Sequence, residues 1–456
     1  MRSVADIRAR VTNRLFGAIA GLIAAALVAL APSAASAQKL TVLHSFDETN
    51  AFDNGFEPQG AVLLNPTTGT LFATASLGGG QCTGGDGGCG VALELKPNGD
   101  NVPTVFERIH VFGLTFGDGG KVPGDGRGPA SLVADGKGNL YGTTPRGGFY
   151  QYCEEDGCGT VYMLTPPATK AGKWSEKLIH AFTGLPHDGV TPEAAPVRDA
   201  KSGVLYGTTC NGDGNINDYT GEVFSLTPPV KGQTEWGFAV LYTFDGAAHG
   251  GCPTAPLTMD KAGNLYGTTS VGGDKTCSCG IAFELSQSSK GWTQTILHKF
   301  VAGSHDGETP STGLVFDTHG NLYGATSQGG PNGAGTVFEI PAKSGGFASE
   351  KPLHIFVTFD PAGGHPLGDR LAIDAAGNLY GASFGGGSQR GGTVFELTEK
   401  SGKWFAKPLY NFCSKSNCAD GEFPSAGVIR DGSGNLYGTT LDGGKGGNGT
   451  VFMLTP

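Results

Sequence analysis

A seven-residue motif recurs along this chain and restricts the folds that it can adopt. The first full copy reads Gly-Asn-Leu-Tyr-Gly-Thr-Thr, and the seven exact or divergent copies lie at 69–75, 138–144, 203–209, 263–269, 320–326, 377–383 and 434–440. The aromatic residues that anchor these repeats are Phe72, Tyr141, Tyr206, Tyr266, Tyr323, Tyr380 and Tyr437. Successive anchors are 57 to 69 positions apart. A period of this length is typical of solenoids, propellers and other repeat arrays.

Each repeat contains four short strand-like runs separated by turn residues. In the fifth repeat these runs are 312–317, 321–327, 335–340 and 351–356. The Asp-x-x-Gly-Asn sequence between the first two runs predicts a tight hairpin, and no repeat shows the 3.6-residue period of a helix. Four strands in a repeat of this length correspond to one propeller blade. The sequence therefore predicts an all-β fold, a seven-bladed β-propeller with four antiparallel strands per blade.

The glycine that follows the aromatic anchor lies in the middle of a predicted strand, where glycine normally weakens pairing. It is present in six repeats, and Ala73 takes its place in the first. Both faces of a propeller blade are buried. We therefore expect the missing side chain to make room for a bulky residue of the next blade.

The two ends of the repeat region complement each other. Residues 40–46 resemble fourth-strand runs such as 295–300, whereas 449–454 resemble a third-strand run. The last blade thus lacks an outer strand, and the N-terminal region contains a fourth-strand run that belongs to no other blade. Pairing the two would remove an exposed edge, so we expect the N-terminal strand to close the last blade.

The first 37 residues have the pattern of a cleavable signal peptide, with a basic start, an apolar run at 15–31 and small residues at 35–37. The predicted organisation is a signal peptide at 1–37 and a propeller at 38–456. Signal removal lowers Lys+Arg from 31 to 27 and Asp+Glu from 41 to 40, so the net charge falls from −10 to −13. An acidic surface argues against nucleic acid and anionic membranes. We expect a secreted or periplasmic protein without a transmembrane segment.

Ten cysteines in a chain predicted to be exported indicate disulfides. The close pairs are Cys82 with Cys89, Cys153 with Cys158, and Cys413 with Cys418, and a longer link is predicted between Cys210 and Cys252. A bridge between Cys277 and Cys279 would be strained. The alternative is that one of these two reaches Cys252. Zinc is a rival interpretation, but the pairs lack the second Cys or His pair of a structural zinc site.

The repeat also resembles a known family. The pattern Pro-x-x-Gly-Leu-Val-x-Asp-x-x-Gly-Asn-Leu-Tyr-Gly-Thr-Thr-x-x-Gly-Gly, followed by Gly-Thr-Val-Phe-Glu-Leu, is similar to the GloVer tandem repeat of exported bacterial proteins. The resemblance covers nearly all of 38–456. It implies export and β-propeller-like repeats, and it implies no established activity. The Asp-x-x-Gly-Asn-Leu-Tyr turn is also similar to turns of NHL-type and streptogramin-lyase-type propellers.

Histidines fall into two sets. One set occupies a single fourth-strand position, where Tyr242 and Tyr410 stand in two repeats, and is interpreted as packing: His44, His110, His180, His298 and His354. The other set lies in loops between blades, except for His319 in a tight turn. A repeated set of Asp residues precedes proline in such loops: Asp53, Asp125, Asp188, Asp306 and Asp420. These loops are predicted to lead to the channel mouth, on the face that also carries the cysteines and the insertions of the early repeats.

Residues on that face are the candidates for binding. Repeated Asp and His there could hold a cation or a polar ligand, and aromatic side chains could line a groove for a glycan. The candidate ligand-binding residues are His187, Asp188, His249, His305, Asp306, His365, Asp420, Phe149, Tyr150, Tyr152 and Tyr219. Apart from such a cation, no cofactor is predicted.

No nucleophile elbow, His-Glu-x-x-His motif, P-loop or EF-hand loop is present in the sequence. The leading hypothesis is therefore a monomeric, secreted binding or scaffold module without catalytic residues, whose partner is a polymer, glycan or protein. One alternative is a propeller enzyme of the lyase or lactonase type with a metal at the channel mouth. The other is a structural protein of the cell envelope.

Overall fold

The computed structural model describes residues 38–46, 55–80, 88–98, 102–113, 124–149, 153, 157–169, 172–185, 187–212, 219–303 and 305–455. Residues Lys39–Thr455 form one compact unit. The predicted signal peptide lies outside the described residues, as do Tyr150, Tyr152 and Cys82. Within the described ranges, no helix is long and apolar enough to cross a membrane.

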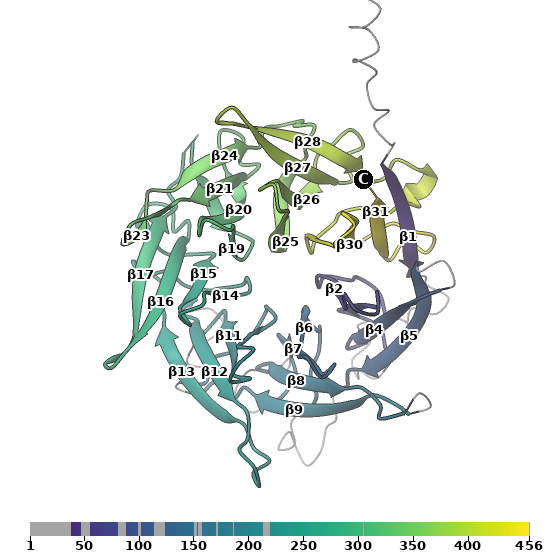
Figure 1. Ribbon diagram of the computed structural model, residues 1–456, viewed down its shortest axis with the longest axis vertical. Helices are drawn as coiled ribbons and strands as arrows, with labels where there is room; N and C mark the ends of the chain where they lie inside the picture. Colours follow the sequence, from purple (N-terminus) through teal and green to yellow (C-terminus); the bar gives the residue numbers. More distant parts are fainter. Residues whose placement is uncertain are drawn as a thin grey trace, which may run out of the picture. The chain divides into compact units, whose positions relative to one another are not determined.

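Seven antiparallel sheets form a ring, which confirms the predicted seven-bladed propeller (Figure 1). Blade 1 contains β2 (Leu63–Leu64), β3 (Leu71–Ala75), β4 (Val91–Pro97) and β5 (Pro103–Val111). Blade 2 contains β6 (Leu132–Ala134), β7 (Leu140–Thr144), β8 (Thr160–Thr165) and β9 (Ser175–Ala181). Blade 3 contains β10 (Val197–Arg198), β11 (Leu205–Thr209), β12 (Glu222–Thr227) and β13 (Gly237–Thr243). Blade 4 contains β14 (Thr258–Met259), β15 (Leu265–Thr269), β16 (Ile281–Ser288) and β17 (Gly291–Lys299).

The remaining three blades depart slightly from this plan. Blade 5 contains β18 (Gly307–Pro310), β19 (Val315–Phe316), β20 (Leu322–Gly329), β21 (Thr336–Ile340) and β24 (Lys351–Ile355), with the small hairpin β22 (Ala342–Lys343) and β23 (Gly346–Phe347) before β24. Blade 6 contains β25 (Gly364–Ile373), β26 (Leu379–Gly385), β27 (Thr393–Lys400) and β28 (Lys403–Asn411), and a short 3-10 turn, η4 (Ser416–Cys418), follows it. Blade 7 contains β29 (Val428–Arg430), β30 (Leu436–Thr440), β31 (Thr450–Thr455) and the N-terminal β1 (Lys39–Ser45). Figure 1 shows β2 and β25 near the centre, and β5, β9 and β17 at the periphery.

Hydrogen bonds explain the polar residues of the repeated motif. In blade 2, Asp135 accepts bonds from two backbone N–H groups of its own turn and from the Tyr141 hydroxyl at 3.2 Å. The same turn, with its tyrosine, recurs at Asp260, Asp317, Asp374 and Asp431. The Thr143 hydroxyl donates to the backbone oxygen of Ala194 in blade 3 at 3.0 Å. The motif therefore closes a hairpin and also joins neighbouring blades.

The glycine of the motif makes room for an aromatic ring of its own blade, so the prediction that the next blade fills the space is wrong. In blade 5, Gly324 lies opposite Phe338 on the adjacent strand. A Cβ atom on Gly324 would lie 2.6 Å from Cζ of Phe338, a contact that Cβ atoms essentially never make. Equivalent contacts of 2.4 to 2.7 Å would arise at Gly142, Gly207, Gly267, Gly381 and Gly438. The ring and the glycine are thus a cross-strand pair.

The ring over the glycine packs in turn against the preceding blade. The rings of Phe300, which follows β17 of blade 4, and Phe338 are 5.1 Å apart in an edge-to-face arrangement. Five further blade pairs repeat this contact at 4.8 to 5.5 Å: Phe112 with Tyr162, Phe182 with Phe224, Phe244 with Phe283, Phe356 with Phe395, and Phe412 with Phe452. All twelve rings are buried. Such pairs contribute about 0.5–1.5 kcal/mol each beyond the burial of their area.

The first blade fills the same position with different side chains. Ala73 replaces the glycine, and it lies opposite Leu93 instead of an aromatic residue. Phe46 from blade 7 belongs to the same buried cluster. Leucine is smaller than a phenyl ring, which leaves space for the methyl group of alanine. In the divergent first copy of the motif, a larger residue at the glycine position is therefore compensated by a smaller residue at the ring position.

The predicted closure of the ring is confirmed. Strand β1 pairs antiparallel with β31, from Lys39 opposite Thr455 to Ser45 opposite Thr450. The N–H of Phe46 donates to the backbone oxygen of Gly449 at 3.1 Å. The two ends of the repeat region thus share one sheet, which leaves β31 without an exposed edge.

We predict that deletion of residues 38–46 lowers the unfolding temperature, because blade 7 loses its outer strand and the buried ring of Phe46. Thermal unfolding followed by circular dichroism is the measurement, and a protein that lacks only 1–37 is the control. Equal unfolding temperatures for the two proteins would show that closure does not stabilise the ring.

We predict that Gly324→Ala destabilises the fold by roughly 1–3 kcal/mol, the range for overpacking a core. Gly432→Ala is the matched control, because its added Cβ would meet nothing within 4 Å. The double variant Gly324→Ala, Phe338→Leu recreates the Ala73 and Leu93 pair of blade 1. It should cost less than the sum of its two single changes in denaturant unfolding. Additive effects would contradict the direct glycine–ring pairing.

Candidate functional site

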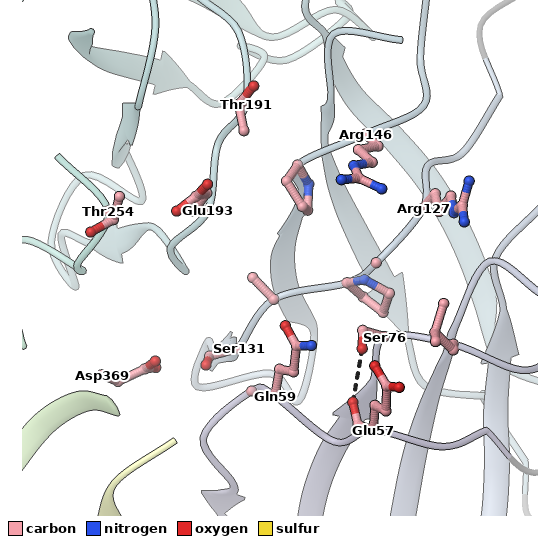
Figure 2. Close-up of a pocket in the computed structure, with 16 residues that line it drawn as sticks. Glu57, Gln59, Ser76, Arg127, Ser131, Arg146, Thr191, Glu193, Thr254 and Asp369 are labelled. Carbon is pink, nitrogen blue, oxygen red and sulfur yellow. Dashed lines mark hydrogen bonds between the residues drawn. The ribbon is translucent and has the colours of Figure 1, made fainter. Parts of the chain in front are cut away.

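Polar side chains from five blades line a cavity of about 570 Å³ (Figure 2). The polar lining residues are Glu57, Gln59 and Ser76 of blade 1, Arg127, Ser131 and Arg146 of blade 2, Thr191 and Glu193 of blade 3, Thr254 of blade 4, and Asp369 of blade 6. Blades that are not neighbours can meet in this way only at the axis of the ring. Figure 2 shows the two arginines on one side of the space and Asp369 across from them.

Two kinds of connection supply this lining. Ser76 directly follows β3, and Arg146 follows β7, so both belong to loops between second and third strands. Glu57, Glu193 and Thr254 lie in segments that enter a blade from the previous one. In an antiparallel blade these two kinds of connection lie on the same face. The cavity therefore opens on the face for which the sequence analysis predicted function.

A bulge in the inner strand of blade 6 brings Asp369 to the axis. The pairing of β25 with β26 shifts register between Leu367 and Ala372. Within the bulge, Gly368 has φ 127°, and a Cβ there would lie 2.2 Å from the backbone nitrogen of Gly427. Only glycine allows so close an approach to blade 7.

Contacts to two other blades fix the bulge. The N–H of Gly313 in blade 5 donates to the backbone oxygen of Asp369 at 2.7 Å. A guanidinium nitrogen of Arg370 donates to the backbone oxygen of Leu257 in blade 4. Asp369 also lines a second cavity of about 420 Å³, which the apolar inner strands surround. Asp369 therefore marks the boundary between a polar mouth and an apolar channel.

Carboxyl groups in the cavity are harder to ionise than usual. Burial raises the pKa of Glu193, and Arg146 opposes the rise only in part. Burial also raises the pKa of Asp369, against a hydrogen bond from Ser131 and the charge of Arg370. For Glu57, burial and then the charge of Asp442 raise the pKa. Perturbed carboxyl groups that share a cleft are typical of functional sites.

This cavity was not predicted from the sequence, although one signal in the sequence pointed to it. The distance from the proline before the first strand to the turn residue that ends it is six or seven positions in six repeats. In the sixth repeat, Pro366 and Asp374 are eight positions apart. This extra residue is the bulge that carries Asp369 and Arg370. The other lining residues occupy positions that differ from repeat to repeat, so no period reveals them.

Fourth-strand histidines and Tyr410 pair with Asp residues of the loops between blades, which the sequence alone did not predict. His180 Nε2 lies 2.7 Å from Asp188, and the Tyr410 hydroxyl donates to Asp420 at 2.7 Å. The same pairing joins His110 to Asp125, His298 to Asp306, and His354 to Asp360. The predicted Asp residues that are described therefore contact outer strands, and none of them lines the axial cavity. Their role as ligands remains a prediction.

The other predicted binding residues lie in separate loops. His249 contacts Asp245 at 2.6 Å, and His365 contacts the backbone oxygen of Ser327 at 2.9 Å. The remaining described candidates are His187 and His305, which are exposed, Phe149, which is partly buried, and Tyr219, which is 48% exposed. None of these side chains lines the axial cavity. The predicted aromatic groove and histidine ring remain untested predictions.

At several interfaces a third residue from the next blade faces the fourth-strand histidine or tyrosine, and its identity varies. It stands four positions before the fourth-strand histidine or tyrosine of that blade. The ring of Phe238 stacks on His180 at 4.2 Å, and Gln294 accepts a bond from Tyr242 at 3.0 Å. Two interfaces carry glutamate instead. At one of them, burial and then the charge of Asp125 raise the pKa of Glu176 to about 7, and its Oε1 atom is buried without a hydrogen bond.

Disulfides join the described cysteines as predicted in most places. The bridges are Cys153–Cys158, Cys210–Cys252, Cys277–Cys279 and Cys413–Cys418. Cys89 is also disulfide-bonded, and its predicted partner Cys82 lies outside the described residues. The alternative link from Cys252 to Cys277 or Cys279 is wrong, because Cys252 is bonded to Cys210. The long bridge connects blade 3 to the segment that enters blade 4.

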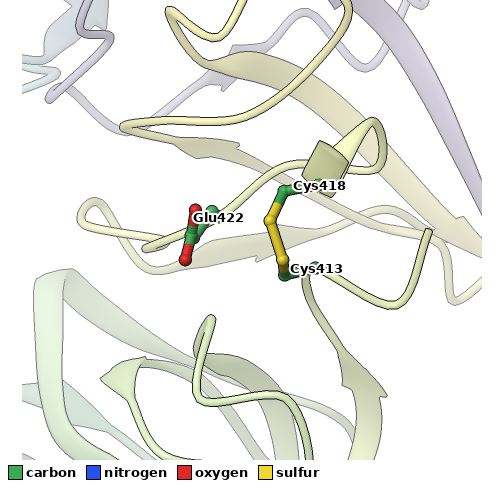
Figure 3. Close-up of side chains that lie close together, drawn as sticks. All are labelled: Cys413, Cys418 and Glu422. Carbon is green, nitrogen blue, oxygen red and sulfur yellow. A yellow bond between two sulfur atoms is a disulfide. The ribbon is translucent and has the colours of Figure 1, made fainter. Parts of the chain in front are cut away.

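Figure 3 shows Glu422 beside the disulfide of Cys413 and Cys418. These three side chains come close enough to surround a metal ion. Their sulfur atoms are bonded to each other, however, and metal ions bind cysteine as the thiolate. This cluster therefore cannot hold a metal in the oxidised protein.

We predict that Glu176→Gln stabilises the protein at high pH. Because the folded pKa of Glu176 lies above its ordinary value of 4.5, the wild type loses stability as pH rises from about 4.5 to about 7, where Glu176 must carry a buried charge. The gain should reach roughly 1–2 kcal/mol above pH 7, after allowance for solvent screening, and vanish near pH 4. Denaturant unfolding across this range measures it, with the exposed Glu235→Gln as control. A gain that is independent of pH would contradict the interpretation.

Several solved structures are similar to this chain at low sequence identity. A puromycin hydrolase is 12% identical at a TM-score of 0.49, over 86% of this chain and 50% of that one. A glucose dehydrogenase is 14% identical at a TM-score of 0.41, over 92% of this chain and 99% of that one. A Trypanosoma rangeli sialidase is 11% identical at a TM-score of 0.43, over 92% of this chain and 59% of that one. No curated protein sequence matches this chain. The model of the Gloeobacter/Verrucomicrobia repeat matches residues 128–369, more than half of the chain, and the protein belongs to this repeat family.

Proposed function

We propose that the protein is an exported binding module that takes a small, carboxylate-bearing polar ligand, such as a sugar acid, in the axial cavity. The observation that carries this proposal is the meeting of two guanidinium groups with carboxyl, hydroxyl and amide groups from five blades in one space of about 570 Å³. This volume lies in the range of ligand pockets. Export is supported by the disulfide-bonded cysteines.

The chemistry of the lining matches an anionic, hydroxylated ligand. Arg127 and Arg146 can form charge-assisted hydrogen bonds with a carboxylate. Gln59, Thr191 and Thr254 offer amide and hydroxyl groups that suit sugar hydroxyls. Burial raises the pKa of Glu193 and of Asp369. This shift lessens their repulsion of an anionic ligand, and a carboxyl group in its neutral form can donate a hydrogen bond to the ligand. The apolar channel beneath Asp369 can receive a less polar end of the same molecule.

One observation favours the enzyme alternative. Burial raises the pKa of Glu193 and of Asp369, and a carboxyl group with a raised pKa is a candidate general acid. On this hypothesis the same cavity would cleave its ligand. Product release from the ligand during prolonged incubation distinguishes the two functions. A metal at the channel mouth, a scaffold role and a monomeric state remain proposals.

The test is calorimetric titration of the protein with glucuronate and, for comparison, with glucose. We expect binding of glucuronate and little binding of glucose. Arg146→Gln should weaken glucuronate binding by about tenfold to a hundredfold, since a hydrogen bond to a charged group contributes about 1.5–3 kcal/mol. Lys231→Gln, an exposed cation in the turn before β13, is the matched control. Equal affinity for both sugars, or an unchanged affinity in the Arg146 variant, would overturn the proposal.

A further inference from the structure

The interface between blades 4 and 5 gathers one imidazole and two carboxylates. His298 lies on β17 of blade 4, Asp306 lies in the segment that enters blade 5, and Glu350 directly precedes β24 of blade 5. His298 Nε2 is 3.1 Å from Asp306 Oδ2 and 3.8 Å from Glu350 Oε2. One ligand atom from each of the three residues lies within 4.8 Å of the other two. None of them lines the axial cavity.

Among the described residues, Glu350 has no hydrogen-bond partner for its charge. Its side chain is 6% exposed, and its nearest charged partner, His298, lies beyond hydrogen-bonding distance. Asp306, in contrast, accepts bonds from His298 and from the N–H groups of Val301 and Gly307. A buried carboxylate without a donor costs free energy unless a proton or a cation neutralises it.

The spacing of these atoms fits a bound metal ion. A tetrahedral zinc ion holds nitrogen and oxygen ligands at about 2.0–2.2 Å, which places the ligand atoms roughly 3.3–3.6 Å from one another. Two of the three separations, 3.1 Å from His298 to Asp306 and 3.8 Å from His298 to Glu350, bracket that range, and the third lies within 4.8 Å. His298 is 20% exposed and Asp306 14% exposed at the side chain, so an ion and a completing water can reach the cluster from solvent.

The chemistry of the ligands selects the class of metal. Imidazole nitrogen with two carboxylate oxygens suits zinc and similar divalent transition metals. Calcium and magnesium prefer sites made of oxygen alone. We propose that His298, Asp306 and Glu350 form a binding site for one divalent transition-metal ion of the zinc class, which links blade 4 to blade 5.

Another interface of the same ring shows what the glutamate adds. His354 and Asp360 form the same pair between blades 5 and 6, at 3.0 Å. The position that corresponds to Glu350 is there occupied by Ala406, which has no ligand atom. The His–Asp pair by itself is thus a repeated structural element, and the site requires the third side chain. The chain therefore contains its own matched control.

The experiment uses protein purified without a histidine tag, stripped with a chelator and dialysed against zinc at neutral pH. Glu350→Gln and Glu350→Ala should each bind one zinc ion fewer per chain than the wild type. His354→Gln should bind as many ions as the wild type. With cobalt as a probe, the wild type should gain visible d–d absorption without a thiolate charge-transfer band, and the Glu350 variants should lose it.

Thermal unfolding in chelator keeps this test independent of folding. Both Glu350 variants remove an uncompensated buried charge, and Glu350→Ala copies the neighbouring interface, so both should unfold at or above the wild-type temperature. Zinc should raise the unfolding temperature of the wild type by mass action and leave that of the variants unchanged. Equal zinc counts in the wild type and the Glu350 variants would overturn the proposal. So would a loss of zinc in His354→Gln as large as in the Glu350 variants.

Discussion

The contact of one aromatic ring with one glycine determines how the blades of this propeller assemble. In blade 5 the ring of Phe338 lies over Gly324 of its own blade and meets Phe300 of the preceding blade edge to face. The ring could not lie there if the glycine carried a side chain, and the ring is part of the buried cluster through which blade 5 packs against blade 4. The contact recurs at five other interfaces. Local pairing within a blade and packing between blades therefore favour the same structure, which is what makes a repeat sequence fold to one state.

Sequence reasoning found the features that repeat. The motif, the number of blades and the closing strand follow from periodicity, since equivalent positions of each repeat must pack in equivalent surroundings. The partner of the motif glycine was assigned wrongly for the same reason: a period shows that a ring is needed at each interface, but only the register of Gly324 with Phe338 shows which blade supplies it. The tight turns were predicted because Asp and Asn bond locally.

The features that do not repeat were largely missed. The axial cavity is assembled from five blades, and residues such as Arg146 and Glu193 are unrelated in sequence. A repeat pattern identifies only residues at equivalent positions of the repeats, so it cannot predict that these residues lie close together. The His–Asp pairs were missed differently, because the sequence displayed both sets while their contact depends on how the loop folds back on the outer strand. Those loops differ in length and composition from blade to blade.

The interfaces between blades also contain an outer position at which the side chain can change without changing the fold. Every interface holds a fourth-strand histidine or tyrosine, and the next blade presents one side chain to it. Phe238 makes that position a stacking contact, Gln294 makes it a hydrogen bond, and Glu350 makes it a cluster of ionisable groups. Because the aromatic rings over the glycines already hold the blades together, this outer position contributes little to closure. Substitutions there can alter charge and ligand binding at one interface while the other six keep their packing.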